Sequence, residues 1–173
     1  NPISPYGLAK QSAELYCKFY AKQFNLKVGI LRLFSTYGPG LKRQVIFDIY
    51  KKLKANPPYL ELLSRKGDAR DMSFVEDMAQ SIIKLNSSVV PDGDIINIGS
   101  GFSTEIFKIA ELIGQQLNYK GQILYSAKGQ IYDGKNWIAD ITKLKKLDIT
   151  HKTGIEEGIK KTIELWEKDS MSK

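Results

Sequence analysis

Apolar residues recur three and four positions apart over residues 5–24, and this spacing predicts an amphipathic helix. Ser4 is a residue type that caps helices, and Pro5 suits the first helical position. Asn25 is predicted to end the helix. The apolar positions are expected to form one broad buried face, made of Ala9, Ala13, Tyr16, Cys17, Tyr20 and Phe24.

Further along the chain, short apolar runs alternate with amphipathic segments and with turn residues. The apolar runs predict strands at 27–34, 59–63, 95–98 and 122–125, with shorter extended pieces at 71–75 and 137–138. The amphipathic segments predict helices at 44–55, 76–85 and 104–117, a short helix from Asp140 to 147, and a last helix from Thr153 to about 168. The glycines and proline of 36–40 predict a loop. Alternating strands and helices are typical of an α/β fold with a parallel sheet.

The composition is that of a globular protein rather than a membrane or metal-binding one. The 173 residues suit one domain with a proper core, and no apolar run approaches the roughly 20 residues that span a bilayer. Cys17 is the only cysteine, which excludes an internal disulfide and fits a reducing compartment, so we expect a cytoplasmic protein. One histidine and one cysteine are too few for a His/Cys zinc site.

The net charge of +7 does not indicate a nucleic-acid partner. The lysines are spread over the predicted helices, as on solvated helix faces, and no basic run is interleaved with stacking aromatics. A small anionic ligand, such as a nucleotide diphosphate, is compatible with this charge.

Tyr6 and Lys10 are the strongest candidates for chemistry. A spacing of four residues places both side chains on one face of the predicted helix. An ammonium beside a phenol favours the phenolate, and such a tyrosine can exchange a proton with a substrate hydroxyl near neutral pH. Many helices carry Tyr and Lys four apart without any catalytic role, so this pair alone leaves both interpretations open.

Three other segments are candidates for ligand contact. Ser35, which follows a predicted strand, lies where ligands bind in open α/β sheets, although a simple strand-to-helix turn is the alternative for this segment. Arg70, in a predicted polar turn, is suited to grip two phosphate oxygens, although an ion pair with Asp71 at the surface is an equal alternative. The segment Gly99-Ser100-Gly101 resembles a dinucleotide loop but lacks the third glycine and the acidic residue about twenty positions on, and we interpret it as a structural turn.

Five motifs in order resemble one family. SPYGLAK (4–10), LRLFSTYGPG (31–40), GDARDMSFVEDMAQSI (67–82), INIGSGFST (96–104) and WIADITKLKKL (137–147) resemble the extended short-chain dehydrogenase/reductases, and among these the NAD-dependent sugar-nucleotide epimerases and dehydratases that include UDP-glucose 4-epimerase. The resemblance covers essentially the whole chain. It implies the C-terminal part of a Rossmann-type parallel sheet with a small α/β substrate-binding lobe. It also implies that residues 1–173 are a single fragment without the family's N-terminal cofactor-loop half, and we expect this fragment alone to be inactive and to bind NAD poorly.

The resemblance also implies roles for residues. Tyr6 would be the general acid/base that deprotonates a sugar hydroxyl as hydride moves to NAD, and Lys10 would hydrogen-bond the nicotinamide ribose. The backbone near Phe34 would line the nicotinamide. Ser35 would face the phosphates of the sugar nucleotide, where the family usually has Asn, and Arg70 would grip the diphosphate.

Two more positions of the family's nucleotide site fall near the C-terminus. Asp133 matches an acidic residue of the nucleotide-ribose site, and Gln130 stands where a second arginine is often found. The resemblance therefore implies NAD, or NADP as the alternative, a nucleotide-diphosphate sugar as substrate, and a homodimer as one arrangement of the full-length enzyme. The alternative is a non-catalytic relative that binds nucleotide sugars and retains the fold, which Ser35 and Gln130 support and the Tyr6/Lys10 pair opposes.

Overall fold

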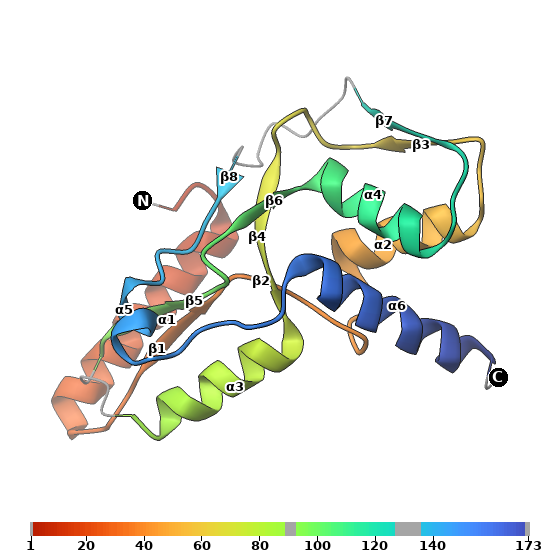
Figure 1. Cartoon of the computed structure of the whole chain (residues 1–173). Helices are drawn as coiled ribbons and strands as arrows, with labels where there is room; N and C mark the ends of the chain where they lie inside the picture. The colour runs from red at the N-terminus through yellow and green to blue at the C-terminus, as the bar shows by residue number, and fades with distance from the viewer. Residues whose placement is uncertain (1, 89–92, 127–135, 172–173) are drawn as a thin grey trace.

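The computed structural model describes residues 2–88, 93–126 and 136–171, which form two α/β lobes on either side of a central group of strands (Figure 1). The helices are α1 (Pro5–Phe24), α2 (Gln44–Lys54), α3 (Val75–Asn86), α4 (Ile106–Gln116), α5 (Thr142–Lys146) and α6 (Ile155–Met171). The strands are β1 (Ile30–Leu33), β2 (Ser35–Tyr37), β3 (Tyr59–Leu62), β4 (Ala69–Phe74), β5 (Ile95–Ile98), β6 (Ser103–Glu105), β7 (Gln122–Tyr125) and β8 (Asn136–Trp137).

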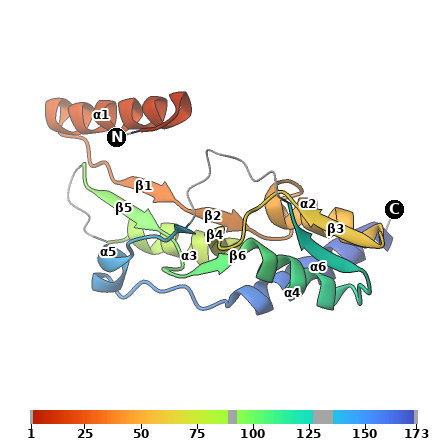
Figure 2. The same cartoon turned by 90° about the horizontal axis from the view of Figure 1, so that it is seen from above.

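The first lobe is built on the parallel pair β1 and β5, in which Ile30 lies opposite Ile95 and Leu33 opposite Ile98. Helix α1 lies on one side of this pair, and α3 and α5 lie on the other (Figure 2). A parallel sheet with helices on both faces is the Rossmann-type arrangement. Its core consists of Met78, Leu85, Ile96, Ile98, Leu144 and Ile149.

The second lobe is built on the parallel pair β3 and β7, where β7 packs against α4, and α4 packs in turn against α2 and α6. Between the lobes, β4 pairs in parallel with β2 and β8 and antiparallel with β6. The larger core of the chain extends from these strands into the second lobe, with Phe74, Leu53, Ile109, Ile113 and Ile159 almost fully buried. The expected α/β class is therefore confirmed.

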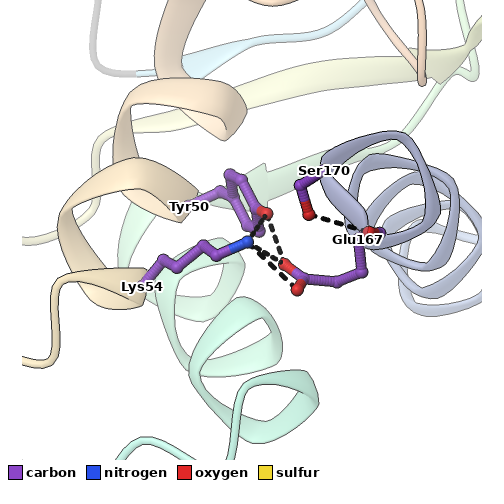
Figure 3. Close-up of polar contacts among 4 residues, drawn as sticks. All are labelled: Tyr50, Lys54, Glu167 and Ser170. Carbon is purple, nitrogen blue, oxygen red and sulfur yellow. Dashed lines mark hydrogen bonds and ion pairs between the residues drawn. The ribbon is translucent and has the colours of Figure 1, made fainter. Parts of the chain in front are cut away.

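Helix α6 is anchored to α2 by aromatic and polar contacts. The ring of Trp166 lies 5.1 Å from that of Phe47 and 4.8 Å from that of Tyr50, and its Nε1 donates to the Pro39 carbonyl at 2.6 Å. The Tyr50 hydroxyl donates to the Glu167 carboxylate, and Lys54 Nζ lies 2.9 Å from the same carboxylate (Figure 3). We call Tyr50, Lys54 and Glu167 the α2–α6 clamp. It fixes the face of α2 that is turned away from the cavity described below.

Several boundaries differ from the sequence expectation because strand pairing between distant segments decides them. Residues 35–37 form β2 rather than the start of a loop, since they pair with Met72–Phe74 of β4. Strand β4 begins at Ala69, so Arg70 lies in a strand and not in a turn. Residues 103–105 pair with β4 as β6, and α4 begins only at Ile106.

Helix α1 has the predicted bounds but not the predicted buried face. The Ser4 hydroxyl accepts the Gly7 N–H at 3.1 Å, and Asn25 ends the helix in the left-handed conformation at φ 52°. However, Ala21 is the one fully buried residue of the helix, and Tyr16, Tyr20 and Phe24 are exposed. The expectation of a broad buried face is wrong for this chain, because no element among the described residues covers that side of the helix.

In the described part of the chain, no helix is long and apolar enough to cross a bilayer.

Candidate functional site

Tyr6 and Lys10 lie in the first turns of α1. The Ser4 cap and Pro5 start the helix just before Tyr6, so local sequence places Tyr6 in the first turn of α1. Lys10 Nζ lies 5.6 Å from the centroid of the Tyr6 ring, a distance at which a cation interacts with the ring face. Tyr6 is 73% exposed, and its hydroxyl is accessible to a ligand.

Phe34 and Ser35 lie where β1 continues into β2. The Phe34 N–H donates to the Ile98 carbonyl at 2.9 Å, and the Phe34 carbonyl accepts the Thr36 hydroxyl at 3.2 Å. Both residues are half-buried. This segment lies at the carboxyl end of β1, which is the edge of a parallel sheet where ligands bind.

A cavity of about 520 Å³ opens between α2, the end of β3 and strand β4. Ser35 and Arg70 both line it, because Ser35 is the register partner of Met72 and Arg70 lies two residues earlier on the same face of β4. Tyr6, Lys10 and Phe34 do not line this cavity. The structure therefore brings two of the predicted ligand residues together and leaves the α1 pair on the other lobe.

Arg70 is half-buried at the cavity wall. Its Nη1 donates to the Ala69 carbonyl at 3.0 Å, and its guanidinium carbon lies 5.9 Å from the centroid of the Trp137 ring. These contacts hold the side chain along β4. The alternative of a surface ion pair with Asp71 is wrong, because Asp71 is buried on the opposite face of the strand and bonded elsewhere.

Asp71 explains the Gly99-Ser100-Gly101 segment. Its carboxylate accepts the backbone N–H groups of Ser100 at 2.8 Å and of Gly101 at 2.9 Å. A Cβ on Gly99 would lie 2.5 Å from Cβ of Ala139, so glycine is required there for close packing. The amides that would bind a phosphate in a dinucleotide loop are thus used within the protein, as expected for a structural turn.

Six polar residues of the cavity were not predicted as site residues from the sequence: Gln44, Asp48, Lys52, Glu61, Ser64 and Asp68. Asp48 and Lys52 are exposed at its rim one turn apart on α2, Glu61 is exposed on β3, and Ser64 is buried. Neither Lys52 nor the Ser64 hydroxyl has a hydrogen-bonding partner among the described residues. The spacing of Gln44, Val45, Asp48, Ile49 and Lys52, which puts them on one helix face, was the available signal.

Asp133, which was predicted to belong to the nucleotide site, and Gln130 both lie outside the described residues. Of the predicted site, the structure thus describes Tyr6, Lys10, Phe34, Ser35 and Arg70.

Comparison with known proteins gives consistent matches. The family model described as "NAD dependent epimerase/dehydratase family" matches residues 1–99, which contain all five of these residues. The chain is 32% identical to a UDP-glucuronate 4-epimerase of Thermodesulfobacterium geofontis over 175 residues, which are 99% of this chain and 52% of that protein.

Two solved structures support the same relationship. The UDP-glucose 4-epimerase of Thermotoga maritima, solved with UDP-glucose, is 28% identical with a TM-score of 0.85, over 98% of this chain and 55% of that one. MoeE5, solved with UDP-glucuronic acid and NAD, is 25% identical with a TM-score of 0.85, over 98% of this chain and 57% of that one. The chain spans about half the length of the relatives it matches. With its family-model match over residues 1–99 and the Rossmann-type fold of its structural neighbours, the chain belongs to the NAD-dependent epimerase/dehydratase family.

Proposed function

We propose that the protein that carries this chain converts a nucleotide-diphosphate sugar, most simply a UDP-sugar, by transient oxidation of a sugar hydroxyl, as an NAD-dependent epimerase or dehydratase. The observation that carries the proposal is the shared cavity of Ser35 and Arg70 together with the accessible Tyr6/Lys10 pair on α1. Relatives named for UDP-sugars and NAD support the choice of substrate and cofactor. Residues 1–173 would supply the last strands and helices of the NAD-binding sheet together with the sugar-nucleotide lobe.

Arg70 and Ser35 would hold the substrate by its phosphates. A guanidinium offers paired donors that match phosphate oxygens, and the Ser35 hydroxyl adds one donor from the neighbouring strand. Asp133, which the family resemblance assigns to the nucleotide ribose, is proposed as a further contact. The apolar residues Leu62, Met72 and Ile106 give the cavity walls that a planar nucleobase needs.

Tyr6 would act as the general acid/base. Its side-chain oxygen would take the proton of the sugar hydroxyl as the hydrogen on the same carbon leaves as hydride, and return of the hydride and the proton would restore the C–H and O–H bonds. Bound NAD supplies the hydride acceptor. The residues present fit that cofactor: Lys10 is exposed with no ion pair among the described residues, so its ammonium is available to Tyr6 and to a ribose hydroxyl, and the Phe34 backbone would line the nicotinamide.

The test is the turnover of UDP-hexoses by the complete protein with NAD. Tyr6→Phe should lower kcat by roughly 10²–10⁴-fold, because the ring remains and only the proton-transferring hydroxyl is lost. Its affinity for UDP should stay unchanged. Tyr16→Phe is the matched control, since Tyr16 is an exposed tyrosine on the same helix at 67% exposure.

The alternative is a non-catalytic protein that binds nucleotide sugars, and the serine at position 35 favours it. It predicts UDP binding without turnover of any nucleotide sugar, and identical behaviour of the two phenylalanine variants. A Tyr6→Phe protein as active as Tyr16→Phe would remove Tyr6 from the reaction.

A further inference from the structure

Helix α1 is tied to strand β1 by one directional contact between Glu14 and Arg32. Arg32 Nε lies 2.6 Å from one carboxylate oxygen of Glu14, and Nη2 lies 2.6 Å from the other. The Glu14 side chain is 16% exposed, although most of the helix around it is open to solvent. Hydrogen bonding to Arg32 lowers the pKa of Glu14 below its ordinary value, and the ammonium of Lys18 acts in the same direction.

This contact lies in line with the proposed acid/base. Tyr6, Lys10 and Glu14 are spaced by four residues, so they form one stripe along α1. Arg32 and Phe34 are two residues apart, so they lie on one face of the extended chain. Helix α1 runs antiparallel to β1 (Figures 1 and 2). Tyr6 is therefore displaced from Glu14 toward the carboxyl end of β1.

Distances along the axis of α1 can be compared with distances along β1, both counted from the Glu14–Arg32 pair. Lys10 is about 6 Å and Tyr6 about 12 Å along the helix axis from Glu14. Phe34 is about 7 Å along the strand from Arg32. Counted from a common level at the Glu14–Arg32 pair, these rises put Lys10 near the level of Phe34, and Tyr6 beyond it, near that of β2.

Among the described residues, the other contacts of α1 are few, and one of them is the Lys18 side chain, which lies beside Gly93. Ala21 is its one fully buried residue, and it lies almost two turns beyond Glu14. A bidentate guanidinium–carboxylate pair fixes both distance and orientation, which a single apolar contact does not.

We propose that the Glu14–Arg32 pair is a positioning device that sets the height and rotation of Tyr6 and Lys10 relative to Phe34 and Ser35. This inference rests on the proposed function for its catalytic consequence. Glu14 and Arg32 touch neither substrate nor cofactor in this scheme. They act through the orientation of the acid/base helix.

The activity test compares Glu14→Gln with Lys143→Met in the complete protein. Lys143 of α5 pairs with Asp94 and is as exposed as Arg32, so its variant loses an ion pair to which no residue of α1 contributes. Glu14→Gln should lower kcat by roughly 10- to 100-fold, since misplacement of about 1 Å has effects of this size. The Kd for UDP should stay unchanged, and Lys143→Met should keep wild-type kcat.

Two further variants separate positioning from general stability. Arg32→Lys should give an intermediate kcat, because a lysine keeps the charge but not the paired donors. The reversal Glu14→Arg with Arg32→Glu should recover part of the lost activity. A Glu14→Gln protein with wild-type kcat, or a loss of kcat shared equally by Lys143→Met, would overturn the inference.

Inactivity of the wild-type protein on every nucleotide sugar with NAD would show that the proposed function is wrong. A structural measurement tests the role of the Glu14–Arg32 pair in that case as well. Amide hydrogen exchange of residues 5–24 should be faster in Glu14→Gln than in wild type, and unchanged in Lys143→Met. Unchanged protection of α1 in Glu14→Gln would overturn the role of the pair whatever the reaction is.

Discussion

Asp71 and Ser100 are joined by two hydrogen bonds to one carboxylate oxygen: the Ser100 N–H lies 2.8 Å and its hydroxyl 2.6 Å from Asp71 Oδ1. The other oxygen accepts the N–H groups of Gly101 at 2.9 Å and of Ala139 at 3.1 Å. One buried side chain of β4 thus connects the turn after β5 with the segment before α5. It holds the strand that carries Arg70 against the first lobe.

Asp71→Asn should destabilise the protein by about 2–5 kcal/mol. The amide replaces one acceptor oxygen with a donor, so at least one buried N–H group loses its partner, and the lost bonds were to a charged group. Urea unfolding of the chain measures the effect. Asp48→Asn is the control, because Asp48 is exposed at the cavity rim and should change the free energy of unfolding by less than about 0.5 kcal/mol. Equal stability of the two variants would contradict the connecting role of Asp71.

Local signals in the sequence were sufficient for some elements and insufficient for others. Ser4, Pro5 and Asn25 act on their own helix, and the bounds of α1 followed from them. The strand at Ser35 depends on pairing with Met72, a partner 37 residues away, and a composition rich in Gly and Pro gave a loop instead. The burial of Asp71 likewise depends on Ser100 and Ala139, which no local pattern connects to it.

In the candidate site, too, the sequence indicated some residues, and only the packing of the structure showed the others. Their places in the chain, and then the family resemblance, indicated Ser35 and Arg70, and the register of β2 and β4 brings them to one cavity. Lys52 and Ser64 carry no motif, and only the packing of α2 against β3 shows that they share that cavity. The apolar face of α1 that includes Tyr16, Tyr20 and Phe24 was expected to be buried, but burial requires a covering surface, and the described chain has none there.

His151 should make the stability depend on pH. Its Nε2 lies 3.1 Å from the Ser81 hydroxyl, and its Nδ1 is buried without a hydrogen-bonding partner among the described residues. Burial lowers the pKa of His151, and the carboxylates of Asp77 and Asp71 oppose this shift only in part. Because the folded pKa lies below the unfolded value of about 6.5, the unfolded chain binds more protons in that window, and stability is lost as the pH falls.

The comparison of wild type with His151→Asn isolates this contribution, since the chain has a single histidine. Between pH 7.5 and 5.5 the free energy of unfolding of wild type should fall more steeply than that of the variant. The difference in slope is at most about 1.4 kcal/mol per pH unit for one proton. Parallel curves would mean that the imidazole titrates alike in the folded and unfolded chain.

Glu167→Gln in the α2–α6 clamp should have a modest effect. Hydrogen bonding to Tyr50 and then to Lys54 lowers the pKa of Glu167, so its carboxylate is charged at neutral pH. The amide keeps an acceptor for the Tyr50 hydroxyl but loses the ion pair with Lys54 (Figure 3). Both side chains of that ion pair are partly exposed. We expect a loss of about 0.5–1.5 kcal/mol in the free energy of unfolding.

Glu157→Gln is the matched control for the clamp. Glu157 pairs with Lys161 on the same helix at 2.7 Å, but both side chains are exposed and no buried tyrosine takes part. Its loss should stay below about 0.5 kcal/mol. If the two variants lose the same amount, the buried Tyr50 adds nothing to the clamp.

Arg70→Ala should weaken the binding of UDP about 10- to 150-fold, because a hydrogen bond to a charged group contributes roughly 1.5–3 kcal/mol. Arg70→Lys should recover only part of this affinity, since lysine lacks the paired donors of the guanidinium. The phosphates lie away from the reacting sugar carbon, so KM should rise far more than kcat falls. Isothermal titration of the complete protein with UDP, with the sugar omitted, measures the binding directly.

Lys52→Met tests whether the second cation of the same cavity takes part. Lys52 has no ion-pair partner among the described residues and lies at the rim, whereas Arg70 lies against β4 and Trp137. A solvated rim charge should change the affinity for UDP less than the half-buried Arg70 does, and its effect should shrink as salt is added.

Arg70→Ala should be measured under conditions where the wild-type protein binds UDP. If the variant then binds UDP with wild-type affinity, Arg70 is not part of the nucleotide site and is a structural side chain of β4.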